Sequence, residues 1–272
     1  MSRYWLGCSG WAYDDWVGPF YPIGTPPGEY LARYARVFRT VEVDSSFYRT
    51  PTPFLVRRWA GVTPEGFRFA LKIPRDVTHP EEGVDSGTAL DGFLANLGPL
   101  RSSGKLGPIV LQFPASFRAR EADRLAALLD AVPLDFSLAV ELRHDSWWSP
   151  ETRRLLEARG AALVWSIVPG AHPPPWVTGE FLYARFIGDR ALTKFDRIQR
   201  DRSTDLEAMR ALFDREGRSA TTVFAYSNNH FMGFGPGTTA RFSEVLGEPT
   251  VDLTEAGRTR GQTRLEDLGA GS

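Results

Sequence analysis

Cysteine and lysine are scarce in this chain of 272 residues. The single cysteine, Cys8, cannot form an internal disulfide and cannot supply the several thiolates of a structural zinc site. The N-terminal stretch turns polar too soon for a signal peptide, and the sequence has no run of about 18 apolar residues. These absences predict a cytoplasmic protein that does not enter the membrane.

The sequence also lacks an excess of either charge. It has 32 basic and 33 acidic residues, with no basic tail or stripe, so a protein that binds nucleic acid through bulk positive charge is excluded. A local pocket for an anion stays open, because net charge does not say where charges lie. The 42% of hydrophobic residues supply a full core and exclude intrinsic disorder for most of the chain.

Eight short apolar runs alternate with segments of helical periodicity, which predicts parallel strands joined by crossover helices. A closed (β/α)8 barrel of the triosephosphate-isomerase type over residues 1–254 fits the count and the length, and an open doubly wound sheet is the alternative. Residues 255–272 are polar and predict a flexible tail. The expected strands are 4–8, 40–43, 67–71, 109–113, 137–141, 162–167, 181–186 and 221–226, and the expected helices are 27–38, 53–61, 88–100, 119–132, 149–159, 204–215 and 238–246.

In such a barrel the functional face is made by the C-terminal strand ends and the loops after them. Lys72 ends the third run, in a chain where 29 of the 32 basic residues are arginines. Lysine can give up a proton and arginine cannot, so this position suggests a proton donor or base. The structural alternative is a lysine paired with a carboxylate on a neighbouring strand.

The fifth run ends in V-E-L-R-H-D-S-W-W at 140–148. Glu141 and Arg143 share a face if the strand extends that far, and His144 titrates near neutral pH. We therefore predict Lys72, Glu141 and His144 as catalytic residues. The alternative is a buried polar network that holds the mouth of the barrel.

Other polar and aromatic side chains follow the remaining strands. Arg143 and Arg185 are the residue type that grips a carboxylate or phosphate with two hydrogen bonds, and a glycine-rich loop at 233–240 suits an anion at a helix start. Aromatic rings in the loops suit stacking on sugars or bases, although packing of long loops explains them equally well. The predicted binding residues are Arg143, Arg185, Gln112, Asn228, Asn229, Asp44, Tyr48, Trp11 and Trp147.

Known metal and cofactor motifs are missing. The four histidines, His79, His144, His172 and His230, have no paired spacing, and no His-Glu-x-x-His, Walker or dinucleotide-binding motif is present. We therefore predict no metal and no cofactor. A metal site assembled from separate strands, such as Glu141, His144 and His230, is the alternative.

Seven ordered motifs at the strand ends resemble the YecE-like family, a domain-of-unknown-function family (number 72). The resemblance implies a barrel of the triosephosphate-isomerase type with its site at the C-terminal face, and a relation to nuclease-type barrels has been suggested. The polar set that it implies is Glu42, Lys72, His79, Gln112, Glu141, Arg143, His144, Arg185, Asn228 and Asn229. The motifs are G-C-S-G-W at 7–11, V-E-V-D-S-S-F-Y-R at 41–49, L-K-I-P-R-D-V-T-H at 71–79, L-Q-F-P-A-S-F at 111–117, A-V-E-L-R-H-D-S-W at 139–147, Y-A-R-F-I-G at 183–188 and Y-S-N-N-H at 226–230.

The chain departs from the usual pattern of that family. Ile187 stands where members commonly have histidine, and residues 166–169 contain no aspartate. The leading hypothesis is thus a metal-independent enzyme, a hydrolase or lyase, that acts on an anionic sugar-, nucleotide- or carboxylate-like ligand. The alternatives are a noncatalytic binder of single-stranded nucleic acid and a metal-dependent phosphodiesterase. No membrane contact and no obligate protein partner are expected.

Overall fold

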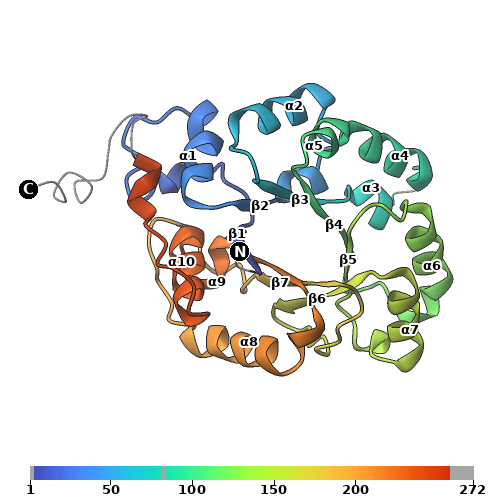
Figure 1. Ribbon diagram of the computed structural model, residues 1–272. Coiled ribbons are helices and arrows are strands. Elements are labelled where there is room, and N and C mark those ends of the chain that lie inside the picture. The colour runs from blue at the N-terminus through green and yellow to red at the C-terminus, as the bar shows by residue number, and fades with distance from the viewer. Residues whose placement is uncertain (1–2, 81–83, 258–272) are drawn as a thin grey trace, which may run out of the picture.

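Eight parallel strands form a ring that is surrounded by helices in this computed structural model (Figure 1), which describes residues 3–80 and 84–257. The hydrogen-bonded order is β1-β8-β7-β6-β5-β4-β3-β2. The predicted (β/α)8 barrel is confirmed. The strands are β1 (Tyr4–Cys8), β2 (Thr40–Val43), β3 (Arg68–Lys72), β4 (Leu106–Gln112), β5 (Leu138–Glu141), β6 (Ala162–Ile167), β7 (Phe181–Phe186) and β8 (Thr222–Ser227).

The barrel closes between β1 and β2 through a narrow seam. A parallel bridge joins Ser9 to Glu42, where the Gly10 amide donates to the Glu42 carbonyl over 2.8 Å. Deeper in the seam, the Tyr34 hydroxyl accepts from the Cys8 amide and donates to the Thr40 carbonyl. A tyrosine on an outer helix therefore completes the hydrogen bonding that β1 and β2 do not make directly.

The helices form the outer layer and begin and end at ordinary sequence signals. The helix at 150–159 is typical: the Ser149 hydroxyl accepts from the Thr152 amide at its start, Pro150 occupies the first turn, and Gly160 ends it with φ 65°. The helices are α1 (Tyr30–Val37), α2 (Pro53–Val62), α3 (Arg75–Thr78), α4 (Ser86–Asn96), α5 (Gly98–Ser102), α6 (Ala122–Ala131), α7 (Pro150–Arg159), α8 (Ser203–Arg215), α9 (Asn229–Met232) and α10 (Gly235–Val245), with the 3₁₀ turns η1 (Asp14–Trp16), η2 (Pro27–Glu29), η3 (Asp44–Phe47), η4 (Ala119–Glu121), η5 (Asp145–Trp147), η6 (Gly217–Ser219) and η7 (Leu253–Gly257).

One detail of the predicted helices is corrected by the structure. The segment 88–100 is two helices, α4 and α5, because Pro99 has no amide hydrogen to continue the first helix and instead occupies the first turn of the second. Between β6 and β7, where no helix is predicted, residues 168–180 contain none. Prolines at 169 and 173–175 lack the amide hydrogen that a helix interior needs.

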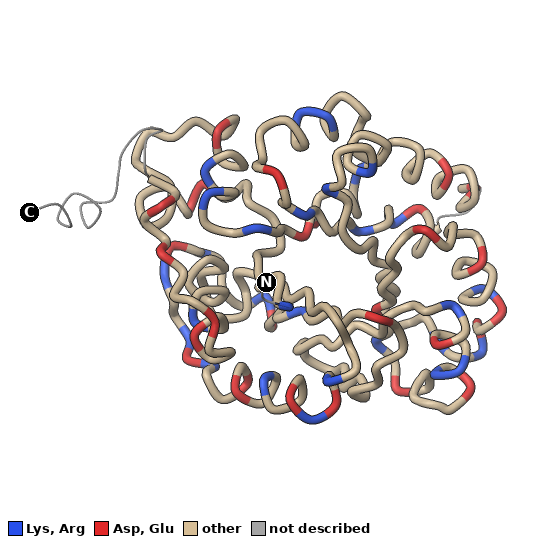
Figure 2. Tube along the Cα trace, viewed as in Figure 1, with Lys and Arg blue, Asp and Glu red and all other residues tan. Residues whose placement is uncertain are grey.

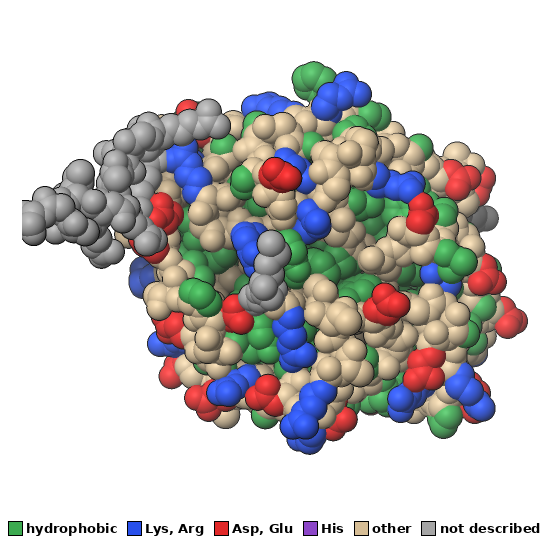
Figure 3. All heavy atoms as spheres, in the orientation of Figure 1, with side chains coloured by type: hydrophobic (Ala, Val, Ile, Leu, Met, Phe, Trp, Pro, Cys, Tyr) green, Lys and Arg blue, Asp and Glu red, His purple; other side chains and the backbone are tan. Residues whose placement is uncertain are grey.

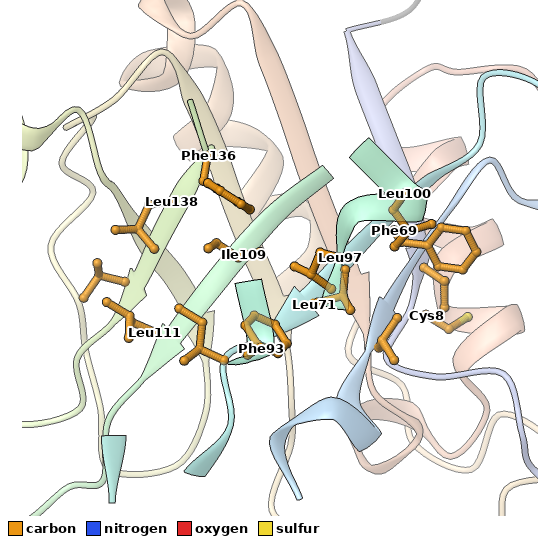
Figure 4. Close-up of a cluster of buried hydrophobic side chains, with 14 of the residues drawn as sticks. Cys8, Phe69, Leu71, Phe93, Leu97, Leu100, Ile109, Leu111, Phe136 and Leu138 are labelled. Atoms are coloured by element: carbon orange, nitrogen blue, oxygen red, sulfur yellow. The ribbon is translucent and has the colours of Figure 1, made fainter. Parts of the chain in front are cut away.

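Apolar side chains fill two compartments. Between the strands and the outer helices, Phe69, Leu71 and Ile109 pack against Phe93 and Leu97 (Figure 4). Inside the barrel a separate cluster fills the lower part, and includes Ala70, Val110, Ala139, Phe181, Tyr183, Phe224 and Tyr226. Because this interior is packed, a ligand has room only at the ends of the barrel.

Charged residues of both signs are spread over the outer helices (Figure 2) and over the face shown in Figure 3. Within residues 3–80 and 84–257, no helix has the length and apolarity needed to cross a membrane. In the predicted tail, Glu255–Gly257 belong to η7 and Ala256 is buried, while 258–272 lie outside the described residues. The domain boundary at 254 stays a prediction.

The seam predicts that Gly7 tolerates no side chain. A Cβ atom there would lie 2.2 Å from the Thr40 carbonyl oxygen, so Gly7→Ala must push β1 away from β2. We expect a loss of about 2–3 kcal/mol in the free energy of unfolding, measured in urea. Gly61→Ala is the control, because nothing lies near its Cβ position and alanine favours the helix. Equal stability of the two variants would contradict the seam.

Candidate functional site

The C-terminal ends of the strands surround a polar pocket of about 510 Å³. Residues from seven of the eight strand ends or the loops after them line it, and β6 is the exception among the described residues. The pocket therefore lies where the barrel architecture predicts a site. Its lining residues are Tyr13, Asp44, Phe47, Tyr48, Lys72, His79, Gln112, Pro114, Ala115, Arg143, Arg185, Ile187, Arg190, Phe195, Asn228, Asn229 and His230.

Arg185 on β7 forms the floor of the pocket and is 2% exposed. Its Nη2 donates to Glu42 Oε1 over 2.8 Å, and its Nη1 donates to Glu141 Oε2 and to Gln112 Oε1. Burial alone would lower the pKa of Arg185, but Glu42 and Glu141 outweigh it and raise that pKa well above its usual value. The guanidinium is therefore a permanent charge that ties β2, β4 and β5 to β7.

Glu141 lies beneath the pocket surface with both carboxylate oxygens engaged. Oε1 accepts from Arg143 Nε over 2.6 Å, and Oε2 accepts from Arg185. Burial alone would raise the pKa of Glu141, but Arg185 and Arg143 hold it at about 2. A carboxylate this acidic is ionised at neutral pH and is already occupied by two arginines, so the geometry makes Glu141 a positioning residue.

Glu42 holds the other side of Arg185. Its Oε1 also accepts from the Ser9 hydroxyl over 2.8 Å, and its Oε2 accepts from the Tyr183 hydroxyl over 2.7 Å. The side chain is fully buried. Glu42 thus links the closing seam of the barrel to the ion cluster, which consists of Arg185, Glu42 and Glu141. The strand-end pattern alone did not single out this role.

Lys72 pairs with Asp44, which directly follows the neighbouring strand β2, as in the structural alternative given for this lysine. The Lys72 ammonium also lies 5.5 Å from the centre of the Phe47 ring. Burial and then Arg185 lower the pKa of Lys72, against the opposing effect of Asp44. Burial alone would raise the pKa of Asp44, but Lys72 and Arg185 outweigh it and lower that pKa. This is the one lysine–carboxylate pair in the pocket lining.

The end of β8 contributes Asn228 and Asn229, which both line the pocket. Asn228 Oδ1 accepts from the His230 amide and caps α9. Asn229 Oδ1 accepts from Trp16 Nε1 and from the Gly235 amide. The glycine-rich loop therefore packs against Asn229 and Trp16 and contributes no residue to the pocket lining.

Besides Glu141, which lies beneath the pocket, three other predicted site residues are not part of its lining. Trp147 is fully buried and donates to the Phe117 carbonyl. Trp11 packs edge-on against Trp59 and Phe69. His144 caps η5, where its Nδ1 accepts from the Ser146 amide over 3.1 Å. Local packing and capping decide these positions, and strand-end placement cannot reveal either.

Arg190 and Phe195 line the pocket although they lie well beyond the end of β7. The loop that carries them folds back over the barrel, since the Phe195 amide donates to Asp15 Oδ2 and the Gln199 amide donates to the Met232 carbonyl. His79, which the family resemblance implies, also lines the pocket. The other lining residues that the predicted set lacked are Tyr13, Phe47, Pro114, Ala115, Ile187 and His230. In the described part of the chain, no group of three His, Cys, Asp or Glu residues is arranged to hold a metal ion.

Comparison with known proteins places the chain in a family. Residues 5–262 match the family model DUF72, which is described as 'Protein of unknown function DUF72'. The chain therefore belongs to that family. The UPF0759 protein YecE of Escherichia coli K12 is 32% identical over 53% of this chain and 50% of its own length, and YunF of Bacillus subtilis is 31% identical over 57% of each. The chain thus aligns with about half the length of these curated relatives.

Solved structures agree with the family and the fold. A DUF72 family protein from Thermotoga maritima superposes with a TM-score of 0.78 and 28% identity, and the match covers 91% of this chain and all of that one. A DUF72 family protein from Enterococcus faecalis superposes with a TM-score of 0.75 over 92% of this chain and 98% of its own. At 22% identity, the second likeness shows the fold alone.

The ion cluster predicts that Glu42→Gln greatly lowers the free energy of unfolding. The neutral amide leaves Arg185 buried with one carboxylate fewer, which is expected to lower the free energy of unfolding by about 3–5 kcal/mol. The control is Glu157→Gln, since Glu157 pairs with Arg153 on the exposed face of α7 and its loss is expected to change stability by less than about 1 kcal/mol. Urea unfolding measures both, and similar losses in the two variants would contradict the cluster.

Glu141 also predicts a pH dependence. Its pKa is about 2 in the folded chain and near 4.5 when unperturbed, so between these values the unfolded state binds more protons. The stabilisation from Glu141 is therefore complete above about pH 4.5 and is lost as the pH falls towards 2. Carboxyl ¹³C NMR of the folded protein, with Glu141 assigned through its backbone, measures the titration directly. A midpoint near 4.5 would refute this assignment.

Proposed function

We propose that this DUF72 barrel binds a small anionic sugar-, nucleotide- or carboxylate-like ligand in the pocket and transfers a proton on it, with no metal required by the step. One observation carries the proposal. Four cationic side chains line the pocket, and Asp44 is the one carboxylate among the lining residues. Glu42 and Glu141 lie below, so a ligand meets mainly positive charge. The cationic residues are Lys72, Arg143, Arg185 and Arg190.

Lys72 is the residue proposed to move the proton. Burial lowers the pKa of the Lys72 ammonium below its usual value, and an ammonium can give up a proton where a guanidinium cannot. Asp44 holds the ammonium in place and stabilises the charge that returns when the proton is taken back. Arg143, held by Glu141 on one edge and partly exposed, is placed to bind the anion.

The remaining lining residues suit a compact organic ligand. Gln112 and Asn228 offer amide groups to hydroxyls, and Tyr13, Phe47 and Phe195 offer ring surfaces. A single-stranded nucleic acid would need a run of exposed rings along a groove. Trp11 and Trp147, two of the loop aromatics to which the nucleic-acid alternative appealed, are packed against the core, which supports the small ligand.

Thermal unfolding against a panel of sugar phosphates, sugar acids, nucleotides and carboxylates tests the binding step. A ligand at about 100 times its Kd adds roughly 2.7 kcal/mol and raises the midpoint by about 5–10 °C. We expect at least one such shift, lost in Arg143→Ala and kept in Arg153→Ala, whose guanidinium lies on the exposed face of α7. No shift with any member of the panel would refute the proposal.

Lys72→Arg separates proton transfer from binding. The variant keeps a positive charge beside Asp44 but cannot release a proton, so we expect ligand affinity within a few-fold of wild type and turnover lower by about 100-fold or more. Exchange of a carbon-bound ligand proton for deuterium in D₂O, followed by ¹H NMR, measures the transfer even when the product is unidentified. Exchange at the wild-type rate in Lys72→Arg would exclude Lys72 as the proton carrier.

A further inference from the structure

The cations of the pocket differ in whether a carboxylate already neutralises them. Lys72 pairs with Asp44, and Arg143 pairs with Glu141. Arg185 lies between Glu42 and Glu141. Arg190 forms no ion pair or side-chain hydrogen bond with any residue of the described ranges.

The charges of the pocket therefore sum to a small excess. Among the described residues, four cations, Lys72, Arg143, Arg185 and Arg190, meet three carboxylates, Asp44, Glu42 and Glu141, which leaves one positive charge. The two histidines of the lining add nothing at neutral pH. Burial lowers the pKa of both His79 and His230, with a further decrease from Arg75 at His79 and from Arg190 at His230.

The backbone at Arg190 is also exceptional. Its φ is 61°, and among the described residues no other non-glycine residue has a positive φ. Left-handed geometry is costly for a side chain such as arginine, and residues held in it concentrate at ligand clamps and active sites. A glycine or an asparagine at this position would relieve the strain.

The segment around Arg190 is held in place from both sides. Gly188 packs so closely on α9 that a Cβ would lie 2.4 Å from the His230 carbonyl oxygen. Asp189 accepts from the Ala191 amide and from Arg200 Nη1 over 2.6 Å. The neighbours are thus fixed to the scaffold, while the Arg190 side chain is exposed at the pocket.

We propose that Arg190 binds the charged group of the ligand and that this group is a single carboxylate. The inference rests on the proposed function and narrows its ligand class. One uncompensated positive charge is balanced by one negative charge, so a sugar acid suits the pocket better than a phosphate monoester, which carries nearly two. Arginine meets a carboxylate with two parallel hydrogen bonds, which fixes the orientation of the ligand as well as its charge.

The test uses Arg190→Asn and Arg190→Gly, which remove the charge and accept the left-handed backbone. Arg197→Asn is the matched control, because Arg197 lies on the same loop, pairs with Asp196 and does not line the pocket. The probes are acetate, D-glucuronate and D-glucose 6-phosphate, at up to about 50 mM and constant ionic strength, with thermal unfolding as the readout.

We expect D-glucuronate to stabilise the wild type and Arg197→Asn more than D-glucose 6-phosphate does. Both Arg190 variants are expected to unfold at or above the wild-type midpoint and to bind D-glucuronate about 10-fold more weakly or worse. Lower midpoints for both variants without probe would show a structural role and overturn the proposal. It is overturned equally if neither carboxylate stabilises the wild type or if D-glucose 6-phosphate is the better ligand.

The outcomes separate this inference from the proposed function. If Arg143→Ala does not bind a panel ligand that Arg190→Asn binds as the wild type does, the proposed function is supported and the role of Arg190 is refuted. Absence of any panel ligand would refute the proposed function itself.

Discussion

The salt-bridged guanidinium of Arg185 is the constraint on which the rest of the site depends. Taking an arginine and two glutamates out of water is unfavourable unless all three are paired, and here each carboxylate contacts the guanidinium. Removal of one member leaves an uncompensated buried charge. The floor of the pocket is therefore held by electrostatics above a packed, mainly hydrophobic interior, and β2, β4, β5 and β7 are fixed relative to one another.

This cluster divides the polar residues into two groups. Glu42, Glu141 and Arg185 have their hydrogen-bonding capacity largely used within the protein, so they shape the pocket and set its charge. The other cations of the lining are Lys72, held by Asp44, Arg143, held by Glu141 and partly exposed, and Arg190, on its folded-back loop; these are the cations that the proposed function assigns to the ligand. A fixed floor beneath the other cations of the lining is the arrangement that the proposed function requires, because it would position a ligand without reorganisation.

The fold was readable from the sequence because the eight strands are buried, and buried parallel strands are short apolar runs. The residues at the strand ends were readable for the same reason, and Asp44, Lys72, Gln112, Arg143, Arg185, Asn228 and Asn229 do meet in one pocket. The partner of Lys72 was not readable from the sequence, because the alternation of side chains along a strand gives the face on which a residue lies but not which carboxylate reaches it. Trp11 and Trp147 pack against the core, and His144 caps a turn. Arg190 lies on a loop that is held by hydrogen bonds between segments distant in the sequence. The periodicity of the sequence does not encode any of these three features.

We infer that the pocket carries one positive charge that the described residues do not neutralise. Crystals soaked in bromide, with the ions located by anomalous scattering, test it most directly because bromide reports uncompensated charge without a choice of ligand. We predict the strongest protein-bound bromide in the pocket beside the Arg190 guanidinium, and none between Arg185 and its glutamates. Bromide confined to other surfaces, with the pocket empty of it, would contradict the claim.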